Sequence, residues 1–206
     1  MPLFYQQALN CETRIGVWQI TEDESFFHDI LPQYAVSHPH KRLQHLAGRH
    51  LLRELYPDFP LGLIRVGATR KPFLDDDAYH FSISHCGDFA AAIVSPVHRV
   101  GADIELFTPR VARIREKFLH PDERAWAPDS DLPLLTLLWN CKEAVFKWWS
   151  YGKVDFSEQI RIEPVQLQQQ GRVEASFLDG DRRIGLHLDY QLFDGLSLAW
   201  VVDDQR

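Results

Sequence analysis

The amino-acid sequence predicts an α+β fold made of two pseudo-symmetric halves, each a helix packed on a small, mainly antiparallel sheet. Three observations favour this fold: a long helical apolar pattern, short strand-like runs after it, and a second half that repeats the order of helix and strands. With 206 residues, the chain is long enough for two small domains. We expect an N-terminal half of residues 1–106 and a C-terminal half of residues 107–206, with an active site in the groove between them.

The first half is expected to contain two helices followed by short strands. Loose alternation over 14–20 predicts a strand. Thr21 and Glu24 then form a capping-box pattern for a helix that Pro32 ends. The second helix covers 39–55, because its apolar residues recur on one helical face. These residues are Leu43, Leu46, Ala47, Leu51 and Leu55. Strands are then predicted over 63–66, 79–84, 90–94 and 99–105.

The second half shows the same order of elements. Thr108 stands before Pro109 as the cap of a short helix, and a further short helix follows Pro121. A long helix is predicted over 134–149. Strands are predicted over 159–162, 172–177, 183–190 and 196–202. The dipeptides Asp179-Gly180 and Asp194-Gly195 are typical of hairpin turns.

Composition and charge exclude several classes of protein. No apolar run reaches the ~20 residues of a membrane-spanning helix, and the first eleven residues lack the basic start and apolar segment of a secretory signal. Cys11, Cys86 and Cys141 are odd in number and widely spaced, which predicts reduced thiols and no zinc site. A net charge of −7 disfavours a nucleic-acid scaffold. We therefore expect a cytoplasmic protein that binds neither nucleic acid nor membrane.

The strongest chemical signal is the run Val100-Gly101-Ala102-Asp103-Ile104-Glu105. Side chains alternate faces along a strand, so Asp103 and Glu105 project to the same side while their neighbours face the core. Gly101 is expected to leave room for a ligand beside them. Two carboxylates about 7 Å apart form half of a site for a hard cation such as Mg²⁺, which substrate phosphates and water complete. The alternative is an ordinary strand whose outer face is solvated.

A second signal lies in the long helix, where Trp139, Glu143 and Lys147 recur every four residues and share one stripe. Glu143 is suited to complete a metal site or to accept a proton, and Lys147 offers a point charge for a phosphate. The alternative is a Glu–Lys surface pair worth a few tenths of a kcal/mol.

Other polar groups of the first half are suited to bind an anion. Ser84 and His85 end a strand before a glycine-bearing turn, where a hydroxyl and an imidazole can donate to phosphate oxygens; an ordinary turn is the alternative. Cations gather in two places, although a solvated helix face and loop explain them as well. They are Lys41, Arg42, Arg49, Arg65, Arg70 and Lys71. Four nearby histidines lack a zinc-protease arrangement, and we do not expect them to bind metal: His38, His40, His45 and His50.

Taken in order, these motifs resemble the 4'-phosphopantetheinyl transferase superfamily, especially its surfactin-synthetase-activating type. The resemblance covers about Leu43 to Lys147 and rests on a Gly-Ala-Asp-Ile-Glu strand, a Trp-x-x-Lys-Glu-x-x-x-Lys helix and an upstream Ser-His pair. It implies transfer of the 4'-phosphopantetheine arm of coenzyme A to a serine of an acyl or peptidyl carrier protein, with release of 3',5'-ADP. It also implies a monomer, because two halves of one chain build the groove.

The resemblance implies roles for individual residues. Mg²⁺ would be held by Asp103, Glu105 and Glu143, with Glu143 also the base for the carrier serine and Lys147 a catalytic contact to phosphate. The implied coenzyme A site contains Arg42, Arg49, Lys71, Pro72, Ser84, His85, Asp103 and Lys147. Either Lys41 or Arg42 supplies one of its cations, and Glu123 resembles an acidic position near the site.

The chain departs from the family pattern at a few positions. Asn140 and Cys141 replace a small residue and an apolar one after the tryptophan, and Ala102 replaces a branched aliphatic residue; we interpret these as packing changes. Residues 148–152 differ from a glycine-rich stretch, which bears on the choice of carrier. Two alternatives remain: a non-catalytic carrier-binding homologue, and another Mg²⁺-dependent phosphotransferase. The absence of Walker and GxGxxG motifs disfavours the common nucleotide-binding classes.

Overall fold

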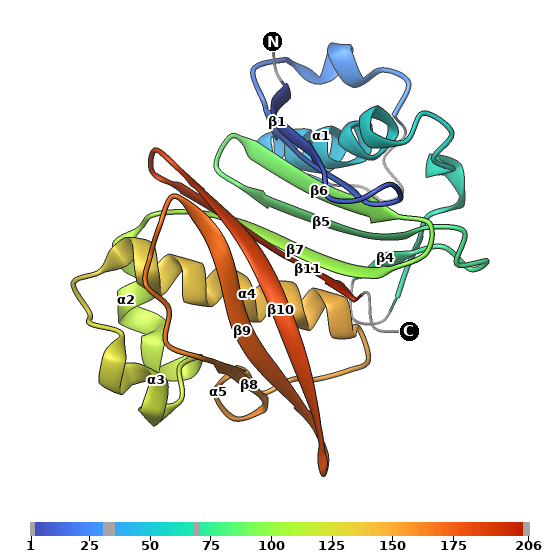
Figure 1. Cartoon of the computed structure of the whole chain (residues 1–206). Coiled ribbons are helices and arrows are strands. Elements are labelled where there is room, and N and C mark those ends of the chain that lie inside the picture. The colour runs from blue at the N-terminus through green and yellow to red at the C-terminus, as the bar shows by residue number, and fades with distance from the viewer. Residues whose placement is uncertain (1–2, 31–35, 68–70, 204–206) are drawn as a thin grey trace. The chain divides into compact units, whose positions relative to one another are not determined.

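The computed structural model describes residues 3–30, 36–67 and 71–203 (Figure 1). The chain divides into two compact units, Met1–Val100 and Gly101–Arg206. Each unit combines one long helix with an antiparallel sheet, which confirms the α+β class. The division comes earlier than the expected boundary near residue 106, because the strand with Asp103 and Glu105 is hydrogen-bonded into the sheet of the second unit.

The first unit is a four-stranded sheet in the order β1-β2-β6-β5, with a helix on it. Its elements are β1 Leu3–Ala8, β2 Arg14–Gln19, a 3₁₀ helix η1 Glu24–Phe27, α1 Pro39–Leu55, a 3₁₀ helix η2 Leu61–Leu63, β3 Arg65–Val66, β4 Pro72–Phe73, β5 His80–Cys86 and β6 Phe89–Ser95. The sheet pairings are antiparallel, from Ala8 opposite Arg14 to Cys86 opposite Phe89. The apolar stripe of α1 packs against β2 and β6, as its periodicity predicts.

Two sequence predictions in this unit were wrong in detail. The helix expected after Thr21 is only the short 3₁₀ helix η1, and its cap is Asp23, whose carboxylate accepts a hydrogen bond from the backbone N–H of Ser25. Thr21 instead donates its own backbone N–H to Glu22. The expected stop at Pro32 lies outside the described residues. The strand β1 was not predicted, because its polar edge-strand sequence is mostly exposed and shows no clear alternation.

The second unit is a five-stranded sheet in the order β7-β11-β10-β9-β8. Its elements are β7 Arg99–Leu106, α2 Pro109–Ile114, a 3₁₀ helix η3 Arg115–Lys117, α3 Pro121–Trp126, α4 Leu132–Trp149, α5 Phe156–Gln159, β8 Ile160–Ile162, β9 Gln170–Asp179, β10 Arg182–Phe193 and β11 Leu196–Asp203. In Figure 1, α4 runs behind the long β9–β10 hairpin, and it packs on β11. The apolar side of α4 forms the core of this unit together with the sheet.

The predicted hairpin turns are confirmed. Gly180 and Gly195 have positive φ values of 59° and 73°, which glycine adopts without strain. Each turn joins neighbouring antiparallel strands, β9 to β10 and β10 to β11. Among the described residues, no helix has the length and apolar character needed to cross a membrane.

Helix α4 lies very close to strand β7 at Gly101. A Cβ atom there would lie 2.1 Å from the carbonyl oxygen of Ala144 and 2.7 Å from the backbone nitrogen of Trp148. The expectation that Gly101 leaves room for a ligand was therefore wrong, since the backbone of α4 fills that space. Because alternate residues share one face of a strand, Asp103 and Glu105 also project toward the side that α4 covers.

We predict that Gly101→Ala destabilises the protein by about 3 kcal/mol, because the new methyl group meets backbone atoms that cannot move independently. Gly185→Ala on β10 is the matched control, because, apart from its chain neighbours, no atom of the described residues lies within 4 Å of a Cβ atom built there. The free energy of unfolding of this variant should stay within about 0.5 kcal/mol of the wild-type value. Urea unfolding of both variants measures the difference. Equal stability of the two variants would contradict the close approach of α4 to β7.

Candidate active site

Asp103 of β7 accepts hydrogen bonds from two side chains of α4. The Lys147 ammonium lies 2.7 Å from Oδ1 of Asp103, and the side-chain N–H of Asn140 donates to Oδ2 at 2.8 Å. Asp103 is only 3% exposed. A solvated strand face, the alternative considered for this carboxylate, is therefore wrong. The contact with Lys147 also excludes the simple picture of a Glu143–Lys147 surface pair.

Glu105 and Glu143 lie near Asp103 and have raised pKa values. Burial raises the pKa of Glu143 to about 7, and the charges of Asp103 and Glu105 add to the shift while Lys147 opposes it. Burial likewise raises the pKa of Glu105 to about 7, with Asp103 adding to it and a hydrogen bond from Trp139 opposing it. Each carboxyl group is thus close to half-ionised at neutral pH, which is the range a general base needs.

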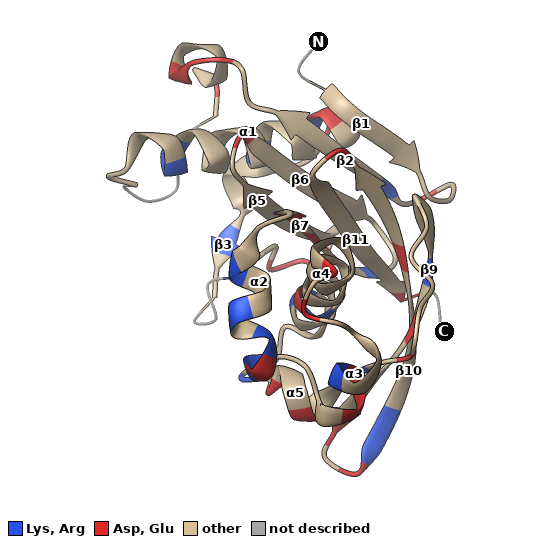
Figure 2. Cartoon of the chain, turned by 90° about the vertical axis from the view of Figure 1, so that its left-hand side faces the viewer, with Lys and Arg blue, Asp and Glu red and all other residues tan. Residues whose placement is uncertain are grey.

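The second unit also carries cations beside these carboxylates. Figure 2 shows blue Lys and Arg positions along the ribbon of α2, the helix that follows β7. One of them, Arg110, lowers the pKa of Glu105 through its charge, although burial outweighs this effect. The local environment is therefore a mixture of buried carboxylates and flanking cations within a protein of net charge −7. Such a mixture is suited to an anionic ligand that arrives with a counter-ion.

The three carboxylates fit a divalent cation as an incomplete set of ligands. Asp103 raises the pKa of both Glu105 and Glu143, and this repulsion is what a bound cation would relieve. Within residues 3–30, 36–67 and 71–203, however, no three His, Cys, Asp or Glu side chains are grouped closely enough to hold a metal by themselves. Oxygen donors of this kind suit Mg²⁺, which commonly takes only one or two carboxylates and keeps water or phosphate as its other ligands.

In the first unit, α1 and β5 bring a second group of predicted residues together. A Cβ atom on Gly48 would lie 2.6 Å from Cγ2 of Ile83, so the helix lies close to this strand. The His45 and His85 rings are consequently 5.5 Å apart. Arg49, 6% exposed, donates to the backbone oxygen of His45. Burial, followed by the charges of Arg49 and Lys41, lowers the pKa of His45.

The other expected coenzyme A residues lie elsewhere in this unit. Arg42 forms an ion pair with Glu24 and donates to the backbone oxygen of Val36. Pro72 begins β4 and pairs with Val66 of β3, and Lys71 directly precedes this strand. Ser84 is buried near the end of β5. Arg70 lies outside the described residues.

The structure reveals a buried ion pair that the sequence interpretation missed. The ammonium of Lys142 lies 2.5 Å from Oε2 of Glu123 and donates to the backbone oxygens of Phe118, Phe156 and Ile160. Lys142 is fully buried, and burial lowers its pKa to about 8 although Glu123 opposes the shift. The pair ties α4 to α3, and the bonds of Lys142 to backbone oxygens also tie α4 to the residue after η3, to α5 and to β8.

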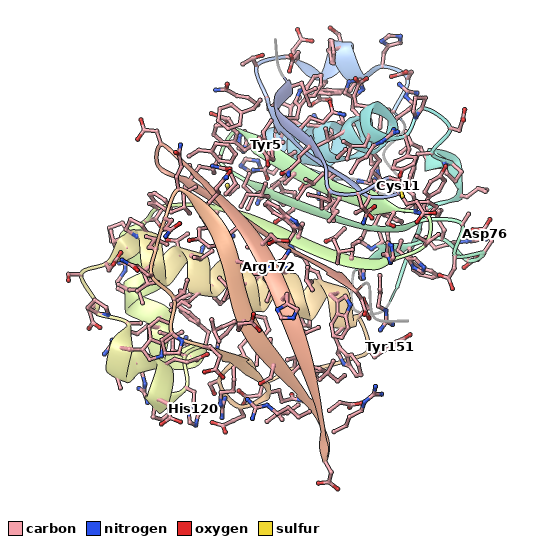
Figure 3. All side chains as sticks on the ribbon, viewed as in Figure 1. Tyr5, Cys11, Asp76, His120, Tyr151 and Arg172 are labelled. Carbon is pink, nitrogen blue, oxygen red and sulfur yellow. The ribbon has the colours of Figure 1, made fainter. Side chains whose placement is uncertain are left out.

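Glu123 also caps α3. Its carboxylate accepts hydrogen bonds from the backbone N–H groups of His120 and Ile162, so Glu123 holds these segments together instead of facing a ligand. His120, labelled in Figure 3, precedes α3 and accepts in turn from Asp122. A signal for this pair was present in the sequence, because Lys142 falls on the apolar stripe of α4 between Leu138 and Val145. A cation in such a stripe needs a buried partner.

Comparison with known proteins agrees with this geometry. The family model of the 4'-phosphopantetheinyl transferase superfamily matches residues 99–201, a segment that contains β7, α4 and all three carboxylates. The "4'-phosphopantetheinyl transferase AcpT" of Escherichia coli O157:H7 is 34% identical over 145 residues, which are 62% of this chain and 72% of the relative. The chain belongs to the 4'-phosphopantetheinyl transferase superfamily.

Other relatives are matched over a smaller share of their own length. "Enterobactin synthase component D" of Salmonella austin is 36% identical over 118 residues, which are 53% of this chain and 48% of the relative. The protein of the same name in Escherichia coli strain K12 is 36% identical over 130 residues, 57% of this chain and 60% of the relative. The chain thus aligns with about half the length of the first of these relatives.

We predict that Lys142→Met destabilises the protein by about 3–5 kcal/mol, because it leaves the charge of Glu123 buried and unpaired. The double variant Lys142→Met/Glu123→Gln should recover part of this loss, since neither buried charge remains. Urea unfolding at neutral pH measures all three proteins. A loss below about 1 kcal/mol for the single variant would show that Glu123 is not held in a dry site.

The raised pKa values of Glu105 and Glu143 predict a pH dependence of stability. From pH 4.5 to about 7, the folded protein keeps protons that the unfolded chain has released, so the free energy of unfolding falls as the pH rises. Without metal, the free energy of unfolding of the double variant Glu105→Gln/Glu143→Gln should exceed that of the wild type by on the order of 1–2 kcal/mol at about pH 8. This figure allows for the partial exposure of both side chains. This advantage should vanish near pH 4.5. Urea unfolding of the two proteins at both pH values, with a chelator present, measures the difference in stability. The same difference at about pH 4.5 and at about pH 8 would contradict the prediction.

Proposed function

We propose that this protein transfers the 4'-phosphopantetheine arm of coenzyme A to a serine of an acyl or peptidyl carrier protein, in a Mg²⁺-dependent reaction that releases 3',5'-ADP. The observation that carries the proposal is the group of three coupled carboxylates, Asp103, Glu105 and Glu143, beside Lys147 within the segment that matches the family. Similarity to AcpT over 72% of its length supports the same activity.

The proposed chemistry requires a base, a phosphate contact and neutralisation of charge. Asp103, Glu105 and Glu143 would hold Mg²⁺, and the bound ion would supply neutralisation of the negative charge of the pyrophosphate. Glu143 accepts the proton of the carrier serine, which its pKa of about 7 permits at neutral pH. The serine oxygen forms a bond to the β-phosphorus of coenzyme A, and the bond from that phosphorus to 3',5'-ADP breaks. Lys147 provides a mobile ammonium for a phosphate oxygen.

The proposed coenzyme A contacts in the first unit rest on the cations around α1 and β5. Arg49, His45 and His85 form the group best suited to an anionic phosphate, with Ser84 beside His85 on β5. Lys71 and Pro72 are proposed to contact the nucleotide end. Arg42 is the weakest of these assignments, because Glu24 already balances its charge.

The free thiols of Cys11, Cys86 and Cys141 support our proposal that the enzyme works in the cytoplasm. The two compact units within one chain support our proposal that it is a monomer. The carrier partner belongs to fatty-acid, polyketide or peptide synthesis, and each type is a substrate to be tested. A carrier-binding homologue without activity would keep the fold but gain nothing from carboxylates whose pKa values match a proton transfer.

We predict that an apo carrier protein gains about 340 Da, the mass of the phosphopantetheine arm, when incubated with this protein, coenzyme A and Mg²⁺. Intact-mass spectrometry follows the gain for fatty-acid, polyketide and peptide carriers. Glu143→Gln should slow the reaction by about 10²- to 10⁴-fold, because the base is lost.

Glu174→Gln is the matched control, since Glu174 is an exposed carboxylate on β9 that pairs with His187. It should react at the rate of the wild type. No mass gain with any carrier, despite Mg²⁺-dependent binding of coenzyme A, would favour a non-catalytic binder. Loss of ADP or phosphate from a different nucleotide would favour another phosphotransferase.

A further inference from the structure

Asn140 is a fully buried amide on the side of α4 that faces β7. Its Nδ2 donates to Oδ2 of Asp103 at 2.8 Å, while its own Oδ1 is buried and has no hydrogen-bond partner among the residues that the structure describes. The interpretation of Asn140 as a packing change was therefore wrong, because the amide binds one of the proposed metal ligands. A buried, half-satisfied amide costs free energy, so its retention calls for a compensating role.

The chemistry of the pair fixes its orientation. An ionised carboxylate only accepts hydrogen bonds, so the amide must present its N–H₂ group to Asp103 and turn its oxygen away. The Lys147 ammonium binds the other carboxylate oxygen, Oδ1, at 2.7 Å. Asn140 and Lys147 are separated by two turns of the same helical face, and Asp103 is held between them.

The two donors differ in how easily they exchange. Asn140 is 0% exposed and short, so its amide is confined by packing. The Lys147 side chain is 21% exposed and flexible, and its ammonium is a point charge that another cation can replace. An alanine or serine at position 140 would be too short to reach Oδ2 without movement of α4, which Gly101 already brings into backbone contact with β7.

We propose that Asn140 is a positioning residue that clamps Oδ2 of Asp103, so that Oδ1 is the oxygen presented to an exchangeable cation, either Lys147 or a divalent metal. The inference rests on the proposed function for the identity of the metal. It assigns this role to a residue that departs from the small side chain expected by resemblance at this position. Removal of the amide takes away one of the hydrogen bonds that orient the carboxylate, which weakens binding of a cation without removing a ligand.

The test is a Mg²⁺ titration of the chelator-treated protein, followed by thermal unfolding and without coenzyme A. Asn140→Leu keeps the number and branching of the side-chain heavy atoms and removes the donor. We expect its metal-free Tm to fall by about 3–8 °C and its half-saturating Mg²⁺ concentration to rise by about 10- to 100-fold. Thr136→Val is the matched control, because Thr136 is a buried polar residue of α4 whose hydroxyl donates within the same helix, to the backbone oxygen of Leu132. Its half-saturating Mg²⁺ concentration should equal that of the wild type.

A double-mutant cycle separates positioning from general damage. If Asn140 acts through Asp103, the Tm loss from Asn140→Leu should shrink to less than half in an Asp103→Ala background. Additive losses, a Mg²⁺ response of Asn140→Leu within twofold of the wild type, or no Mg²⁺ response in the wild type would each overturn the inference. If the positioning results hold while the wild type adds no phosphopantetheine to any carrier, the proposed function fails and the clamp on Asp103 stands.

Discussion

The close approach of α4 to β7 at Gly101 is the constraint on which the candidate site depends. Only a residue without a side chain allows the backbone of Ala144 and Trp148 to lie against the strand. Two residues along β7, Asp103 then meets Asn140 and Lys147, which a helix one side chain further away would not reach. The contact therefore brings the charged residues of the β7 motif and of the α4 motif into one group. It also explains why this group is buried, since the helix itself excludes water from the strand.

Burial has opposite consequences for the charges on the two sides of α4. On one side, Asp103 is balanced by Lys147, while burial and then the charge of Asp103 raise the pKa values of Glu105 and Glu143 more than Lys147 lowers them. On the opposite side, Lys142 is surrounded by Glu123 and three backbone oxygens, so its charge is compensated within the protein. The first side is thus suited to receive a ligand and the second to fix the helix. Carboxylates that repel one another, next to an ion pair whose charges are compensated within the protein, are typical of functional sites built on rigid elements.

Local patterns explain which parts of this structure were predictable from the sequence. The periodic apolar residues of α1 predicted its observed bounds, Pro39–Leu55, and the glycine turns of the last three strands were recognised from their dipeptides. The alternation of β7 and the stripe of α4 identified the carboxylates. The partners of these side chains were not predictable, because Asn140 and Asp103 are 37 residues apart and nothing local records their contact. The short strands β3 and β4 likewise depend on pairing with each other and carry little propensity of their own.

The same reasoning explains how position 140 was misjudged. From the sequence, an asparagine after Trp139 is one polar substitution among apolar neighbours, and packing is the simplest account of it. In the folded chain, the carboxylate opposite this position is the most buried of the proposed metal ligands, so a polar side chain at 140 acts on charge and not on volume. The two faces of this helix differ in the same way: Asn140 and Lys147, on the face toward β7, bond to Asp103, whereas Lys142, on the face toward β8, acts on the stability of the fold. Substitutions in α4 should therefore be classified by face before they are interpreted as catalytic or structural.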